Sequence, residues 1–225
     1  MTLLVTLVVV GLAVYAGSNV IKKYSSLLYV LALALSAAYL YFRFFSSYIP
    51  GVFSALQVMQ KGLIAFALFS IVMFIGVLDE SSRLRLRLHP IRAELSLLGF
   101  CFALGHIVGY LTSYLTTLIR DSAVVPTPAF VSITISFTSF VLLLILSVTT
   151  LSFVRSRMNA LVWKRVQRTA YVFFGLVYIH LMLMLVPALR ADAVDNIISV
   201  AVYTLLFGSY AVLRLLKARR GRSRS

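Results

Sequence analysis

Seven apolar segments account for most of this chain, and they restrict it to a fold that crosses a membrane. Each is about 17 residues or longer, enough at about 1.5 Å per residue to cross most or all of a hydrocarbon layer about 30 Å thick. Lipid supplies no hydrogen-bond partners, so these segments must satisfy their own backbone groups as helices. We therefore expect an all-α integral membrane protein, a seven-helix transmembrane bundle. The segments are approximately Leu3–Val20, Leu27–Phe45, Ser54–Leu78, Glu94–Ile119, Ala129–Val154, Thr169–Leu189 and Ile197–Leu216.

The third segment is the least regular, because Gln57, Gln60 and Lys61 dilute its first turns. We expect those turns to lie at the membrane interface.

The composition leaves no room for a soluble domain, since 61% of the 225 residues are hydrophobic and only 12% are charged. The net charge of +15 does not indicate a nucleic-acid partner, because most Lys and Arg residues gather after the first, third, fifth and seventh segments. Such a bias is typical of cytoplasmic loops. It predicts a multi-pass protein of the inner or cytoplasmic membrane, with the N-terminus outside and the C-terminus in the cytoplasm. This alternation requires an odd number of spans.

Two histidines lie inside the apolar segments, His106 in the fourth and His180 in the sixth. Both segments run outward from the cytoplasm, and the histidines follow Arg92 and Arg168 by rises of about 21 and 18 Å. The imidazoles are thus expected at similar depth, somewhat beyond the midplane. An ionisable side chain at that depth is costly and indicates a functional site by default. Two neutral imidazoles on facing helices could ligate one haem iron.

Each histidine also has a simpler interpretation, a hydrogen bond to a neighbouring hydroxyl such as Ser136, Ser139 or Thr149. A proton relay is disfavoured because no intramembrane Asp or Glu accompanies either histidine. Zinc would require further ligands at the same depth. Gly105 and Gly109, which flank His106, are compatible either with close helix packing or with room for a flat macrocycle.

Two stretches around these histidines resemble the signature of ferric reductase-like transmembrane domains. One is WKRVQRTAY at 163–171, followed by His180. The family typically has Trp, two residues, Leu-His-Arg and then Tyr, with a second histidine thirteen positions after the first. The other runs from Arg92 through His106 to Tyr110 and is similar to an arginine-led helix that carries a haem ligand. The resemblance extends over about residues 80–215 and is strongest to the haem-binding membrane subunit of the periplasmic methionine sulfoxide reductase system.

The resemblance implies a six-helix core preceded by one extra helix. Residues 1–26 would form the additional N-terminal transmembrane helix, 27–216 the haem-binding bundle and 217–225 a basic cytoplasmic tail. It also implies that His106 and His180 are the axial, iron-binding ligands of haem b.

One departure from the family lies at Gln167, which stands where the family has its first histidine in this helix. Glutamine lacks the imidazole nitrogen that haem iron favours, and the fourth segment offers only Arg92 and Ala93 at the corresponding height. His89 lies nearby, but we interpret it as a loop residue. We therefore expect one haem toward the outer side, not two.

Side and depth indicate further site residues, and the resemblance implies further cofactors and the redox partners. Arg120, Arg190 and Tyr114 are candidates to contact haem propionates, and FMN or a quinone is a further candidate cofactor. The chain has no nucleotide-binding domain of its own. The expected donor is a membrane quinol, a bound flavin or a separate cytoplasmic reductase. The expected acceptor is an extracytoplasmic reductase that carries flavin or molybdenum.

The cytoplasmic basic residues have two interpretations. The stretch RLRLRLH at 83–89 alternates with period two, which favours a segment lying along the interface with leucines toward lipid and arginines toward anionic headgroups. Arg155, Arg157, Lys164 and Arg165 could extend the same surface. A phosphate or flavin-nucleotide site is the alternative, because arginine forks suit phosphates. Topology and lipid contact explain the charges without a ligand.

Two functions remain open from the sequence. The first is a membrane cytochrome subunit that transfers electrons. The second is a non-redox membrane protein, a small transporter or an assembly subunit with structural histidines. A transporter would need polar or broken helices near the midplane, for which Thr134–Thr138 is the candidate besides the histidines.

Overall fold

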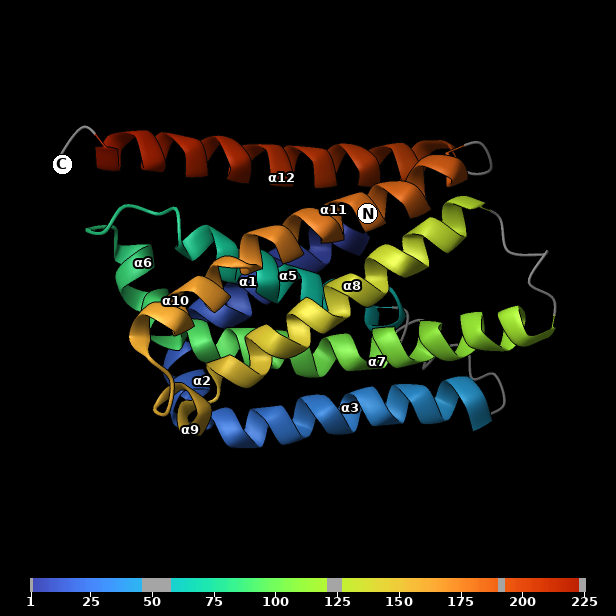
Figure 1. The fold of residues 1–225 in the computed structure, drawn as a ribbon, viewed down its shortest axis with the longest axis horizontal. Coiled ribbons are helices and arrows are strands. Elements are labelled where there is room, and N and C mark those ends of the chain that lie inside the picture. The colour runs from blue at the N-terminus through green and yellow to red at the C-terminus, as the bar shows by residue number, and fades with distance from the viewer. Residues whose placement is uncertain (1, 46–57, 121–126, 190–192, 223–225) are drawn as a thin grey trace.

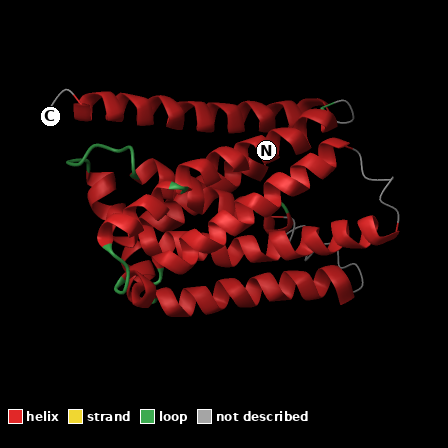
Figure 2. Ribbon diagram, viewed as in Figure 1, coloured by secondary structure: helices red, strands yellow, loops and turns green. Residues whose placement is uncertain are grey.

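The computed structural model describes residues 2–45, 58–120, 127–189 and 193–222, and this described part consists of helices joined by short loops, without a strand (Figures 1 and 2). Most of the long helices lie side by side with their axes along one common direction (Figure 1). The expectation of an all-α membrane protein is confirmed. The helices are α1 (Thr2–Ala16), α2 (Ser18–Lys23), α3 (Ser25–Phe45), α5 (Leu63–Ile75), α6 (Arg83–Leu88), the 3-10 turn η1 (His89–Ile91), α7 (Arg92–Arg120), α8 (Thr127–Thr150), α9 (Ser152–Arg155), α10 (Ala160–Arg168), α11 (Ala170–Ala188) and α12 (Ala193–Arg222).

Among the described residues, five helical stretches are long and apolar enough to cross a membrane. Large hydrophobic side chains on these helices point outward, as lipid contact requires. The chain is therefore a multi-pass membrane protein. The apolar helices α1 and α5 are shorter, so the count of seven spans stays a prediction. The five stretches are Ser25–Phe45, Arg83–Thr117, Phe130–Thr150, Ala160–Ala188 and Asn196–Arg220.

Helix α5 is a core helix, which explains how it can be short. Most of its side chains are buried, and it packs against α1 and α7. A helix that is apolar on every side and surrounded by protein has no need to match the lipid thickness. It begins after Gly62, whose φ of 64° lies in the left-handed region. The third expected span is thus interrupted at Gly62, and its residues 54–57 lie outside the described part.

Small residues bring α3 and α7 together. A Cβ on Gly105 would lie 3.2 Å from the Ser36 Cβ, and one on Gly109 would lie 3.1 Å from the Tyr39 hydroxyl. The Ser36 hydroxyl donates a 3.0 Å hydrogen bond to the Cys101 carbonyl. The two glycines therefore serve close helix packing, and the space beside them is filled by α3 rather than by a macrocycle.

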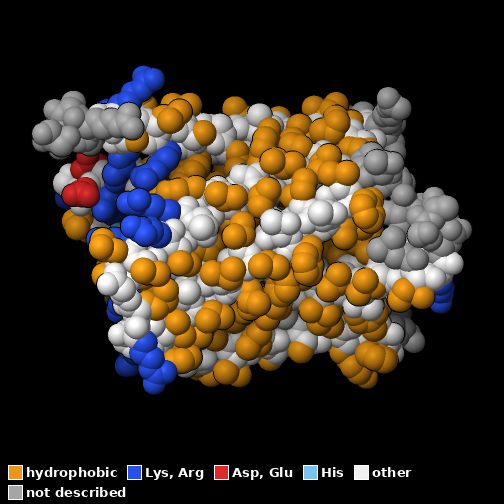
Figure 3. Space-filling model, in the orientation of Figure 1, with side chains coloured by type: hydrophobic (Ala, Val, Ile, Leu, Met, Phe, Trp, Pro, Cys, Tyr) orange, Lys and Arg blue, Asp and Glu red, His pale blue; other side chains and the backbone are white. Residues whose placement is uncertain are grey.

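Most basic side chains visible in Figure 3 gather at the end of the molecule that carries α6, α10 and the C-terminus of α12. The period-two stretch that starts at Arg83 folds there as the short helix α6, with Ser82 capping its first turn. The basic tail expected from residue 217 continues α12 as far as Arg222. The Lys217 ammonium donates to the carbonyls of Gly76 and Leu78, at 3.1 and 2.9 Å, and thereby ties α12 to the end of α5.

Candidate functional site

The structure brings His106 of α7 and His180 of α11 to the walls of one cavity between the helices. Both imidazoles are half-buried. The sequence predicted the two residues as a pair from their similar depth, and both line this cavity. Nothing in the structure tests whether they bind iron.

The His106 ring is held by the helix break before α5. Its Nδ1 lies 2.6 Å from the backbone carbonyl of Gln60. In an unbroken helix that carbonyl would accept from the amide four residues later, but the left-handed Gly62 turns the chain before Leu63 starts α5. A Cβ on Gly62 would lie 3.2 Å from the His106 Cγ, closer than an ordinary contact, and the left-handed φ at this position also favours glycine.

The His180 ring is held by two hydroxyls from α8. Its Nδ1 lies 2.8 Å from Oγ of Ser132 and 2.8 Å from Oγ of Ser136. The Ser136 hydroxyl donates its own hydrogen to the Ser132 carbonyl at 2.7 Å. Its oxygen can therefore accept from Nδ1–H, while the Ser132 hydroxyl can either donate to Nδ1 or accept from it. Ser136 was one of the partners that the simpler interpretation predicted, whereas Ser132 was missed.

The contact of His106 assigns the proton on its ring. The Gln60 carbonyl can only accept, so His106 Nδ1 must carry a hydrogen, and the two serine contacts of His180 are compatible with the same tautomer there. In a neutral imidazole the other nitrogen, Nε2, then carries the lone pair. No hydrogen bond to either Nε2 comes from another described residue. This arrangement, a ring fixed through one nitrogen with the other free, is the one that metal-binding histidines use.

The cavity is narrow and mostly apolar. Its volume is about 140 Å³, and its charged lining residue is Lys61. Cofactor pockets usually measure about 300–1,000 Å³, so a macrocycle enters only if lining side chains move aside. The aromatic rings that line the cavity are Phe66, Phe69, Phe140, Phe173, Phe174 and Tyr203.

The ligand set nevertheless suits haem better than a bare metal ion. Within the described ranges there is no group of three or more His, Cys, Asp or Glu side chains that could hold a metal. Two imidazoles cannot complete a zinc site, but they complete the coordination of an iron already held by four porphyrin nitrogens.

Beyond His106, toward the expected outer side, an aromatic and basic cluster follows α7. Tyr110 lies 4.9 Å from the His106 ring, and Tyr114 lies 6.2 Å from Tyr110. Arg43 of α3 lies 5.6 Å over the Tyr110 ring and donates to the Ser113 hydroxyl at 2.9 Å. Sequence reasoning missed Arg43, because pairing α3 with α7 needs contacts between segments that hydropathy does not reveal.

The residues predicted to contact haem propionates do not lie together beside the cavity in the described part of the chain. Tyr114 is half-buried in the cluster just described and does not line the cavity. Arg120 is exposed at the end of α7, about 21 Å along the helix from His106. Arg190 lies outside the described residues. Their proposed contact with propionates stays a prediction.

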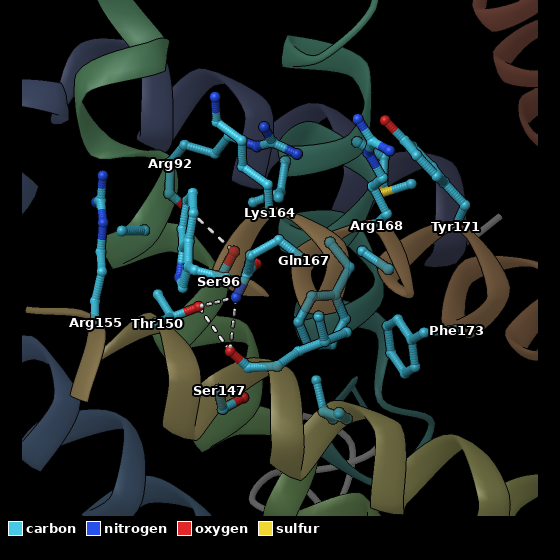
Figure 4. A pocket seen from close by; sticks show the side chains of 18 of the residues that line it. Arg92, Ser96, Ser147, Thr150, Arg155, Lys164, Gln167, Arg168, Tyr171 and Phe173 are labelled. Atoms are coloured by element: carbon cyan, nitrogen blue, oxygen red, sulfur yellow. Dashed lines mark hydrogen bonds between the residues drawn. The ribbon is translucent and has the colours of Figure 1, made fainter. Parts of the chain in front are cut away.

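Gln167 lies on a second cavity, of about 440 Å³, at the basic end of the bundle (Figure 4). Its amide nitrogen is 3.0 Å from Oγ1 of Thr149 and 3.4 Å from Oγ1 of Thr150. Arg92, Ala93 and His89 also line this cavity, although the His89 residue is exposed. The walls therefore offer one imidazole rather than a facing pair.

An all-helical bundle with membrane-length apolar helices, and with imidazoles from two helices on one shared cavity, defines a class, the multi-pass helical membrane proteins. Within that class the chain belongs to the family described as ferric reductase like transmembrane component, which matches residues 61–178, just over half of the chain. The match includes His106 and ends two residues before His180.

One relative is an uncharacterized protein of Treponema pallidum (strain Nichols), 34% identical over 221 residues. The alignment covers 97% of this chain but only 61% of that relative. No solved structure matches the chain.

Proposed function

We propose that this protein is a membrane cytochrome subunit that transfers electrons through one haem b, with Nε2 of His106 and Nε2 of His180 as axial ligands. The observation that carries the proposal is that both rings line one cavity while each is fixed through Nδ1. When bound, the haem supplies a one-electron iron couple. The residues of the chain orient the two imidazoles, exclude water with an aromatic lining and place Lys61 and Arg43 on the outer side for the propionates.

The partners are proposed from family and charge. The protein lies in the cell inner membrane with its basic end facing the cytoplasm. The histidine cavity then lies toward the outer side. A membrane quinol, a flavin or a cytoplasmic reductase donates the electrons, and an extracytoplasmic reductase of flavin or molybdenum type accepts them.

The test is the spectrum of the purified protein. Reduced-minus-oxidised difference spectra of wild type from haem-replete cells should show b-type bands. Both His106→Ala and His180→Ala should lose these bands, whereas His89→Ala, which changes an exposed histidine, should keep them. Bands that survive in both cavity variants would refute the proposed ligands.

A second candidate is a non-redox membrane protein in which the histidines only brace the bundle. It is favoured by the hydrogen bonds that already satisfy each Nδ1 and by the small volume of the cavity. The transporter form of this candidate is disfavoured, because Thr134 and Thr138 lie exposed and bond the carbonyls of their own helix instead of forming a polar path. A colourless wild type with an unchanged fold would favour this candidate.

A further inference from the structure

The second cavity gathers positive charge without a matching negative charge. Arg92, Lys164 and Arg168 lie together along one side of it, and Arg155 lies at another edge (Figure 4). No carboxylate is among its lining residues in the described chain. Like charges held around a common space repel one another, and a bound anion relieves that cost.

Most hydrogen-bond donors of these cations have no acceptor among the described residues. Arg155 stacks over the Trp163 ring at 4.5 Å. Across the described ranges, the side chains of Arg92, Lys164 and Arg168 make no hydrogen bond to another residue, and none of the four cations pairs with a carboxylate. The ion pairs present join Lys22 to Glu94 and Arg85 to Glu80 instead.

The rest of the cavity wall is partly apolar. It includes Phe69, Leu143 and Phe173, which also line the histidine cavity, beside uncharged polar residues such as Ser147 and Thr150. The volume of about 440 Å³ falls in the usual range for small-molecule sites, about 300–1,000 Å³. A ligand with an anionic head and a partly apolar body suits these walls.

We propose that this cavity binds the phosphate group of an amphiphilic phosphate ester. Arg92, Lys164 and Arg168 hold the phosphate oxygens, since guanidinium and ammonium donors form short, charge-assisted bonds with phosphate. The apolar part packs against Phe69 and Phe173. The phosphate belongs either to a membrane phospholipid or to a soluble ester. The inference does not depend on haem at the histidine pair.

The chain carries its own reporter for this site. Trp163 is the one tryptophan in the sequence, lines the cavity, and donates from Nε1 to the Thr149 carbonyl at 2.9 Å. The full chain, purified in neutral detergent and delipidated, is titrated with dihexanoyl phosphatidic acid below its micelle concentration while Trp163 emission is recorded. A saturable change is expected. Dihexanoyl phosphatidylcholine, whose phosphate is shielded by a choline cation, should bind about tenfold more weakly or worse.

Matched variants locate the binding. Lys164→Gln combined with Arg168→Gln should weaken phosphatidic acid binding about tenfold or more. Arg165→Gln changes a cation on the same helix that does not line the cavity, and it should bind like wild type. The b-type spectrum of each variant is recorded in parallel and should not change.

The source of the phosphate is distinguished by a second titration. If glycerol 3-phosphate gives a saturable response like that of phosphatidic acid, the ligand is a soluble ester. If only phosphatidic acid binds, the ligand is a lipid. Both outcomes support the proposal. No saturable response to either probe, an equal response to phosphatidylcholine, or an equal loss in Arg165→Gln would overturn it.

Discussion

Both cavity histidines share one arrangement, a hydrogen bond at Nδ1, and the carbonyl partner of His106 leaves Nε2 of that ring with its lone pair. The sequence predicted the two positions, because matched depth and family spacing are properties of the chain order. It could not predict the Gln60 carbonyl as a partner, since a backbone group becomes available only when the helix before α5 is broken. At the residue scale the structure therefore adds the contacts that orient both rings and the tautomer of His106.

The serines behind His180 provide a prediction. Changing Ser132→Ala and Ser136→Ala together removes both oxygens at Nδ1, so the ring loses its fixed orientation. Partners of this kind contribute about 10–100-fold to the affinity of a metal site. Haem retention during dilution of the purified protein should fall by that order.

Ser139→Ala is the matched control, because Ser139 also lines the cavity but donates to Ile135 of its own helix. Equal losses in the control and in the double variant would contradict the role given to Ser132 and Ser136.

Arg43 and Arg120 give a second pair at the residue scale. Arg43 lies over Tyr110, next to His106, whereas Arg120 is exposed about 21 Å farther along α7. Removing a nearby positive charge disfavours the reduced iron. Arg43→Gln should therefore lower the haem reduction potential by on the order of tens of millivolts. Redox titration of both variants checks this, and a larger shift in Arg120→Gln would restore the original assignment to Arg120.

At the scale of elements, two helix features decide the site. The break at Gly62 supplies a carbonyl to His106, and the close contact of α3 with α7 brings Arg43 to the same ring. The hydropathy pattern showed that the third segment is irregular near the break at Gly62, but it did not indicate a function for that break. The pattern also predicted α3 and α7 as separate spans. It did not predict their contact, because Gly105 and Gly109 were compatible either with helix packing or with room for a macrocycle.

Gly62→Ala tests the helix break. A Cβ there is strained at a φ of 64° and lies 3.2 Å from the His106 ring. The variant should lose haem faster than wild type and unfold at lower temperature, by about 1–2 kcal/mol in stability. Gly175→Ala in α11 is the control, because a Cβ there meets nothing within 4 Å. Full haem occupancy and unchanged stability in Gly62→Ala would contradict the role of the break.

At the scale of the molecule, composition predicted the all-helical membrane fold, and the charge bias agrees with the basic end of the bundle (Figure 3). The number of spans is less determined by sequence. Helix α5 is as apolar as a membrane span, but burial within the bundle accounts for its apolar character equally well. Hydropathy cannot distinguish contact with lipid from contact with protein.

The proposed orientation is tested by labelling. In a Cys101→Ser background, Ser81→Cys and Thr116→Cys place single thiols at exposed positions near opposite ends of the bundle. A membrane-impermeant maleimide added to intact cells should label position 116 and spare position 81. After lysis both positions should be labelled. Labelling of position 81 alone in intact cells would show that the orientation is the reverse of the proposed one.

The measurement that tests the central claim most directly is the ratio of haem to chain, determined by pyridine haemochrome in wild type, His106→Ala and His180→Ala. The account predicts a ratio near one for wild type and near zero for each variant. A wild-type ratio near two would contradict the interpretation of Gln167, and ratios unchanged by either substitution would contradict the histidine pair itself.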